Sequence, residues 1–242
     1  MLKKLDNSQK AGNNHISILY PGLYLSETDT GFYSIGRIDQ ANIGSGVVIK
    51  MHPHINDDIL SYFRRGKVKH SDSEGSEAFI TPRKLMLMKA GKIFHHEEAV
   101  HENVEGLQIF IRPGKKDTSP EVIFDDLEEV HSENKWRLIA SPDKEKTKLQ
   151  LSSDTFIYDT KISASQSLGL PENPKPGFGY LLYVFQGTIV VNGSISLSKG
   201  ESIYISEEDI VVSSEIEAEL VLFVTNVKSP YYDGGMYSGN MK

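Results

Sequence analysis

The chain has 242 residues, no cysteine and a formal net charge of −7. Without cysteine there are no disulfides and no thiolate chemistry, and an acidic surface disfavours direct contact with nucleic-acid phosphates. No apolar run reaches the roughly 18 residues of a membrane-spanning helix, and the first fifteen residues lack the apolar stretch of a secretory signal. We therefore expect a cytoplasmic protein that binds neither nucleic acid nor membranes.

Short apolar runs rich in strand-forming residues dominate the first half of the chain. They cover Ile16 to Tyr20, Gly46 to Met51, Ile59 to Phe63, Leu85 to Met88 and Leu107 to Ile111. Turn-forming sequences separate these runs, and this spacing indicates an antiparallel sandwich or barrel. A weak helical signal follows at 124–131, where we expect a linker.

The second half repeats this style. Its expected strands are Thr155 to Tyr158, Tyr180 to Phe185, Thr188 to Val191, Ser202 to Ile205, Ile210 to Val212 and Glu219 to Val224. Asn192-Gly193 predicts a hairpin, because a type I′ turn needs positive φ at both central residues. The Pro-rich segment 171–177 predicts a loop at the mouth of the second barrel.

A faint internal repeat relates the two halves. The run 59–68 resembles 181–189, since in each an apolar strand leads into a glycine and out along a second strand. We therefore predict an all-β chain of two similar barrels, an N-terminal domain over 1–130 and a C-terminal domain over 131–242. The aromatic segment 229–237 is either a loose terminus or a strap packed on a barrel, and we favour the strap.

All eight histidines lie at or before position 131, so imidazole chemistry belongs to the first half. His52 and His54 follow an expected strand. In an extended chain, residues two apart point to the same face, with Cα atoms about 7 Å apart. A metal ion can bridge two side chains at that separation.

A second cluster, His95-His96-Glu97-Glu98, also follows an expected strand. By the same alternation His95 pairs with Glu97 and His96 pairs with Glu98, so either pair offers one imidazole and one carboxylate. Such ligands suit Fe(II), Mn, Co, Ni, Cu or Zn and not Ca or Mg. Three histidines and one glutamate would leave open positions on a six-coordinate ion, as oxygen activation or Lewis-acid chemistry requires.

Three segments together resemble the pirins, a family of bicupins. His52-Pro53-His54 with the following 58–75 is similar to the family's first motif, and 88–97 is similar to its second motif, a Met-x-Ala-Gly run that ends in His-x-Glu. The segment 106–113 resembles the strand that follows. The resemblance implies two cupin barrels, each a double-stranded β-helix or jelly roll, with one ion in the first barrel and none in the second.

Carried over to this sequence, the resemblance places the metal ligands at His52, His54, His95 and Glu97. It implies an iron-type ion, most simply Fe(II), with Ni, Co, Mn, Cu or Zn as alternatives. Some pirins resemble quercetin 2,3-dioxygenases, which would give the chain a small aromatic substrate and make Glu97 both ligand and catalytic base. Other pirins are regulators that dock onto protein partners, and this second class stays open. We expect a monomer.

Overall fold

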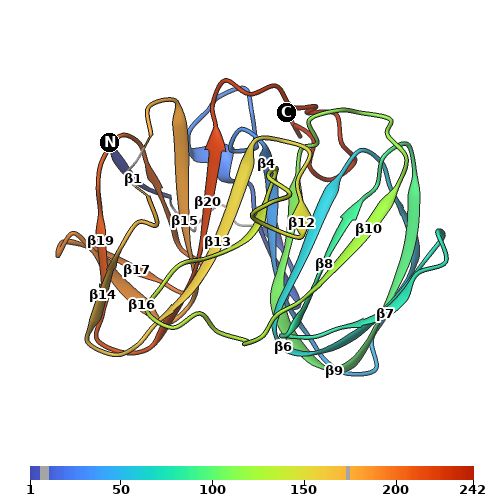
Figure 1. Cartoon of the computed structure of the whole chain (residues 1–242), viewed down its shortest axis with the longest axis horizontal. Helices are drawn as coiled ribbons and strands as arrows, with labels where there is room; N and C mark the ends of the chain where they lie inside the picture. The colour runs from blue at the N-terminus through green and yellow to red at the C-terminus, as the bar shows by residue number, and fades with distance from the viewer. Residues whose placement is uncertain (6–10, 173–174) are drawn as a thin grey trace. The chain divides into compact units, whose positions relative to one another are not determined.

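The computed structural model describes residues 1–5, 11–172 and 175–242, and most of its regular structure is β-strand (Figure 1). The helical element of the described residues is a short 3-10 turn, η2 (Pro21–Tyr24). The all-β prediction is confirmed. Within the described residues, no helix is long and apolar enough to cross a membrane.

The first compact unit, here called the first barrel, contains residues 11–130, 151–153 and 230–242. Its strands are β2 (Ala11–Gly12), β3 (Ile16–Leu19), β4 (Ile35–Ile43), β5 (Val48–His54), β6 (Asp58–Asp72), β7 (Glu77–Ile80), β8 (Lys84–Lys89), β9 (Phe94–Ile111) and β10 (Glu121–Asp126). They pair in the order β10-β8-β6-β9-β4-β3-β2, with β5 added to β9 and β7 added to β6.

Strand β9 organises the first barrel. It has 18 residues, and it pairs with β6 along most of its length, with β5 over its first half and with β4 over its second half. The first residues of β9 therefore lie between β5 and β6. An apolar core that includes Phe63, Met88, Phe94 and Phe110 fills the barrel.

The second compact unit, here called the second barrel, contains residues 1–5, 131–150, 154–172 and 175–229 of the described chain. Its strands are β1 (Leu2–Leu5), β11 (Arg137–Ser141), β12 (Leu149–Gln150), β13 (Thr155–Ile162), β14 (Gln166–Gly169), β15 (Phe178–Gln186), β16 (Thr188–Val191), β17 (Ile195–Ser198), β18 (Ser202–Ile205), β19 (Val211–Ser214) and β20 (Ala218–Asn226). They form a seven-stranded sheet, β1-β18-β15-β20-β13-β11-β12, and a four-stranded sheet, β14-β19-β16-β17.

The local predictions for the second barrel hold well. Asn192 and Gly193 both have positive φ, at 47° and 67°, and they join β16 to β17 in the predicted hairpin. Side chains from alternate positions, such as Leu182, Leu220 and Leu222, build its core. The predicted helix at 124–131 is wrong, because Glu121–Asp126 instead extends the first sheet along β8.

The two ends of the chain depart from a simple division at residue 130. Leu2–Leu5 forms strand β1 of the second barrel, where it pairs with β18. Residues 230–242 belong to the first barrel. We call residues 230–242 the C-terminal strap, since they contain nearly all of the segment 229–237 for which a packed strap is predicted.

Candidate metal centre

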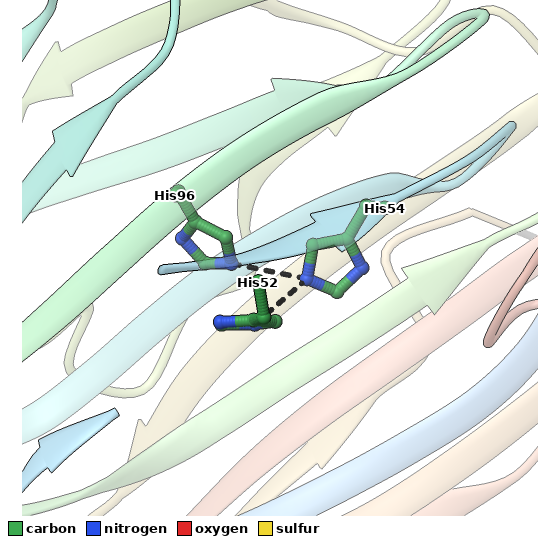
Figure 2. A group of neighbouring side chains, drawn as sticks. All are labelled: His52, His54 and His96. Atoms are coloured by element: carbon green, nitrogen blue, oxygen red, sulfur yellow. Dashed lines mark hydrogen bonds between the residues drawn. The ribbon is translucent and has the colours of Figure 1, made fainter. Parts of the chain in front are cut away.

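Three histidines from two paired strands converge inside the first barrel (Figure 2). His52 and His54 lie two residues apart on β5, and His96 lies opposite His52 in the register of β5 with β9. Directly opposed residues of antiparallel strands send their side chains to the same face. The register therefore brings His96 to the face that His52 and His54 share. His54 and His96 are buried, and His52 is half-buried.

The converging atoms are the three Nε2 nitrogens. Nε2 of His54 lies 3.2 Å from Nε2 of His52 and 3.0 Å from Nε2 of His96. The other nitrogens of the β5 pair face acceptors: Nδ1 of His52 lies 2.9 Å from the carbonyl oxygen of Lys50, and Nδ1 of His54 lies 3.4 Å from Oδ2 of Asp57. Because both partners accept hydrogen bonds, we assign the proton of both rings to Nδ1.

This tautomer assignment tests whether the group suits a metal ion. It leaves a lone pair on Nε2 of both His52 and His54, and the two lone pairs face each other at 3.2 Å. A proton on Nε2 of His96 can form a hydrogen bond to Nε2 of His54. It does nothing for the contact between His52 and His54, where two lone pairs still face each other. A cation at the centre would satisfy all three nitrogens at once. An ordered second partner on Nδ1 is also typical of histidines that bind metals. The donor set therefore fits a transition-metal ion.

A second cluster of possible metal ligands lies next to the three histidines, on the same face of β9 as His96. Glu98 follows His96 by two residues on β9, and His70 lies opposite Glu98 on β6. Ligand atoms of His70, His96 and Glu98 all lie within 4.8 Å of one another. His70 Nε2 is 2.8 Å from Oδ2 of Asp72, while Nε2 of Gln108 donates to both carboxylate oxygens of Glu98 at 3.0 Å.

Burial controls the charge of these groups. Burial, with the neighbouring His54 and His52, lowers the pKa of His96 to about 2, so its ring is neutral and can act as a ligand. Burial also lowers the pKa of His52 and of His70. Burial raises the pKa of Glu98 to about 7, although the hydrogen bond from Gln108 opposes this shift. Neutral imidazoles are the form that binds metal.

The structure separates the residues that the sequence prediction grouped together. It brings together His52, His54 and His96, whereas His95 and Glu97 project to the other face of β9. His95 lies opposite Pro53 and is half-buried, as is Glu97. Two apolar residues indicate which face of β9 is buried. Phe94 and Val100 belong to the apolar core, and they lie an even number of residues from His96 and Glu98, so all four side chains point to the same face. The exposed Ile93 obscured that signal.

The sequence also gave no sign of the residues that hold His54. Asp57 is fully buried, and its Oδ1 accepts hydrogen bonds from the backbone N–H and the hydroxyl of Ser238, at 2.8 and 2.7 Å. The backbone N–H of Tyr237 donates to the same carboxylate at 3.1 Å, and the Tyr237 ring packs 5.1 Å from that of His54. The C-terminal strap thus completes the surroundings of a histidine that lies far away in sequence.

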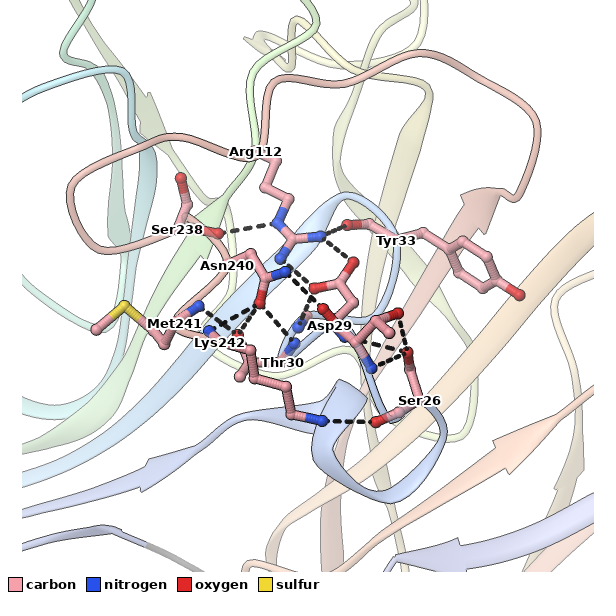
Figure 3. A network of polar contacts seen from close by, with 11 residues as sticks. Ser26, Asp29, Thr30, Tyr33, Arg112, Ser238, Asn240, Met241 and Lys242 are labelled. Carbon is pink, nitrogen blue, oxygen red and sulfur yellow. Dashed lines mark hydrogen bonds and ion pairs between the residues drawn. The ribbon is translucent and has the colours of Figure 1, made fainter.

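Arg112 anchors the strap to the first barrel (Figure 3). Its guanidinium is fully buried, donates through Nε to the Ser238 carbonyl oxygen at 2.9 Å, and pairs with both carboxylate oxygens of Asp29 at 2.8 and 2.6 Å. Asn240 adds a bond from its side chain to the Thr28 carbonyl oxygen at 2.7 Å. This network fixes the position of Ser238 relative to the barrel.

Two family models match the chain, one on each barrel. The model described as Pirin matches residues 4–111, and the model described as Quercetinase C-terminal cupin domain matches residues 138–224. The first match contains all three converging histidines, and the second lies wholly within the part of the chain that has no histidine.

Relatives and solved structures agree with these matches. The chain is 26% identical over 205 residues to quercetin 2,3-dioxygenase of Escherichia coli K12, covering 83% of this chain and 86% of that protein. A bacterial pirin of Escherichia coli solved with nickel(II) superposes with a TM-score of 0.78 at 20% identity, covering 93% of this chain and 99% of that one. A quercetin 2,3-dioxygenase from Acinetobacter baumannii gives 0.75 at 20% identity, covering 94% and 88%. The chain has the two-barrel cupin fold, and it is similar to the pirins over its first barrel and to the quercetinase C-terminal cupin domain over its second.

Proposed function

We propose that the first barrel binds one divalent transition-metal ion through Nε2 of His52, His54 and His96, and that the protein is a dioxygenase of small aromatic substrates. The observation that carries this proposal is the convergence of three Nε2 nitrogens, two of which belong to rings whose Nδ1 faces an acceptor: the Lys50 carbonyl oxygen for His52 and Asp57 for His54. Imidazole ligands favour Fe(II), Ni, Co, Mn, Cu or Zn, and we take Fe(II) as the first candidate.

The reaction class is drawn from the relatives named quercetin 2,3-dioxygenase. A bound ion of this type acts as a Lewis acid toward a substrate hydroxyl and permits reaction with O₂. The chain's own residues supply the setting. His52 and His54 keep their protons on Nδ1, Asp57 orients His54, and the rings of Phe110 and Tyr237 pack beside His54 at 6.1 and 5.1 Å. Aromatic walls next to the centre suit a flavonol-type substrate.

The carboxylate available to this centre is Glu98, which shares the face of His96. We assign Glu98 as the candidate fourth ligand, in the place that the family resemblance assigned to Glu97. Glu97 lies opposite Ser71 on the other face of β9 and is half-buried, so the geometry offers it no route to the three imidazoles.

The metal site is tested by a pair of neighbouring substitutions. Untagged wild type, His96→Ala and His95→Ala are loaded anaerobically with Fe(II), freed of excess ion and analysed for bound metal. We expect about one ion per chain in the wild type and in His95→Ala, and little in His96→Ala. Metal lost from His95→Ala and kept by His96→Ala would overturn the ligand assignment.

The activity is tested separately on protein of known metal content. Loaded wild type is mixed with quercetin in air, and oxygen uptake and carbon monoxide release are followed against His96→Ala. We expect uptake that depends on the loaded ion. A fully loaded protein that consumes no oxygen with quercetin would leave the metal site standing and would refute dioxygenase activity on this substrate.

A further inference from the structure

The second barrel contains a pocket although it contributes no histidine ligands. Aromatic side chains from neighbouring strands form its walls, and residues from two loops form its rim. The walls are Phe156 and Tyr158 of β13, Phe178 and Tyr180 of β15, and Val224 of β20, and the rim is Lys146, Pro171, Glu172 and Lys175. We call this the aromatic pocket. Residues 173 and 174 of the predicted mouth loop lie outside the described part of the chain.

The aromatic pocket takes a place in its barrel like that of the metal centre in the first barrel. In the second sheet the order is β18-β15-β20-β13, which matches β8-β6-β9-β4 of the first. Tyr180 lies opposite Val224, as Ile59 lies opposite Phe110 in the first barrel. The Phe110 ring is 6.1 Å from that of His54. The aromatic pocket therefore lies at the end of the second barrel that corresponds to the position of the candidate metal centre in the first barrel.

The aromatic pocket has room for a ligand larger than water. The cavity volume is about 70 Å³, well above the roughly 10–15 Å³ that one water requires. Phe156, Tyr158 and Phe178 are only half-buried, although they belong to the edge of the apolar core. The rings of Phe156 and Phe178 lie 6.5 Å apart at 54°, so they pack against each other as an aromatic pair in the wall of the pocket.

Two tyrosine hydroxyls, those of Tyr180 and Tyr158, supply polar groups to the aromatic pocket. The Tyr180 hydroxyl accepts a hydrogen bond from the backbone N–H of Lys175 at 3.0 Å. Burial raises the pKa of Tyr158 to about 12, with Glu172 and Tyr180 adding to the effect, so this side chain is a phenol at neutral pH and can donate a hydrogen bond.

The charge of the rim selects among aromatic ligands. It carries two lysines and one glutamate, and Lys175 already pairs with Glu172. Lys146 lies 4.0 Å from the exposed Asp143, a distance at which an exposed pair is weak. A cation at the mouth of an apolar pocket favours a ligand with an anionic group at one end.

We propose that the aromatic pocket is a second binding site, specific for small aromatic molecules that carry an anionic group such as a carboxylate. The site needs no metal ion, and it does not depend on the activity proposed for the first barrel. Its ligand packs the ring against the aromatic wall that includes Phe156 and Phe178 and leaves its anionic group beside Lys146.

Benzoate is the probe for a first test. Its binding to the full chain is measured by calorimetric titration in the presence of a chelator, with benzyl alcohol and cyclohexanecarboxylate as the neutral and non-aromatic analogues. The protein variants are Lys146→Gln, the matched loop control Lys144→Gln, and Val224→Phe, which fills the aromatic pocket. His52→Ala, whose side chain lies in the first barrel, reports whether benzoate binds there instead.

We expect benzoate to bind more tightly than either analogue, Lys146→Gln to weaken binding by up to about fivefold, as for an exposed ion pair, and Val224→Phe to abolish it. Lys144→Gln and His52→Ala should bind as the wild type does. The proposal is overturned if benzyl alcohol binds as well as benzoate, if the two lysine variants behave alike, or if His52→Ala loses binding. Because Lys146 and Lys144 are exposed, their comparison stands even if Val224→Phe does not fold.

Discussion

Asp57 connects His54 to Ser238, a residue 181 positions further along the chain. One carboxylate oxygen faces Nδ1 of His54 at 3.4 Å, while the other accepts two hydrogen bonds from Ser238. A carboxylate behind a ligating imidazole fixes its tautomer and orientation and makes it a better ligand. The geometry of the proposed metal site therefore depends on a contact made by the C-terminal strap.

Replacement of Asp57 by alanine should weaken metal binding by about 10–100-fold, the range found when such supporting groups are removed. The physical reason is that His54 loses the acceptor that keeps its proton on Nδ1. Competition against a chromophoric chelator measures the change. Glu97→Gln is the matched control, since it also removes a carboxylate close in sequence to the histidines but on the other face of β9. Equal affinities for the Asp57 variant and the wild type would refute this role.

Replacement of Arg112 by methionine should destabilise the first barrel by about 1–3 kcal/mol, because it removes the charged hydrogen bonds of a buried guanidinium while Asp29 is only partly buried. Asp29 would be left without its bidentate partner, and the Ser238 carbonyl oxygen would lose its donor. Chemical denaturation followed by circular dichroism measures the loss. Arg65→Met is the control, because Arg65 pairs with Glu105 at an exposed position, and its loss should cost less than about 1 kcal/mol.

Asp58 should make the first barrel more stable at low pH. Burial raises its pKa from 3.8 to about 6, so between these values the folded state binds more protons than the unfolded state. The free energy of unfolding therefore falls as the pH rises from about 4 to 6, by on the order of 3 kcal/mol from this group. Asp58→Asn should remove this dependence. The measurement is the difference in stability between variant and wild type at several pH values.

The exposed Asp126, which pairs with Lys84 at 3.3 Å, supplies the control for that experiment. Asp126→Asn should differ from the wild type by a small amount that stays nearly constant over the same pH range. A difference for Asp58→Asn that is equally flat would show that Asp58 does not titrate as its burial requires.

Gln108 should stabilise the barrel by donating to Glu98. Gln108→Leu removes the hydrogen bonds to both oxygens of a fully buried carboxyl group, and we expect a loss of about 1–3 kcal/mol. Adding Glu98→Gln should recover part of that loss, because a neutral side chain costs less to bury. A double-mutant cycle on thermal or chemical unfolding measures the coupling. Purely additive effects would contradict the contact.

The strands were predictable because their signals are local. Alternation and turn chemistry placed β16 and its hairpin at Asn192-Gly193 correctly, and the run 59–63 is the first part of β6. The choice between His95 and His96 was harder. It depends on which face of β9 is buried, and the apolar residues just before them, Ile93 and Phe94, give opposite answers. The pairing of His96 with His52 places His96 beside the other two imidazoles, and no local sequence pattern encodes that pairing.

The support from Asp57 and Ser238 could not be predicted from sequence patterns. No periodicity links two residues 181 positions apart, and the contact exists because the C-terminal strap packs on the first barrel. The same holds for strand β1, whose Lys-rich sequence gives little sign of the pairing with β18. Both misses involve tertiary pairing of the chain ends, which local propensity does not encode.

The position of Ser238 also sets an order of events during synthesis. A ribosome makes a chain from its N-terminus, so His52, His54 and His96 emerge long before the strap that holds Asp57. Domains generally begin to fold as they emerge, but this barrel lacks its last segment until residues 230–242 have been translated. A metal ion that arrives early would meet a His54 that is not yet held in place. Mature affinity should therefore appear only late, after release of the C-terminal residues, and a nascent chain stalled before residue 230 should bind the ion weakly.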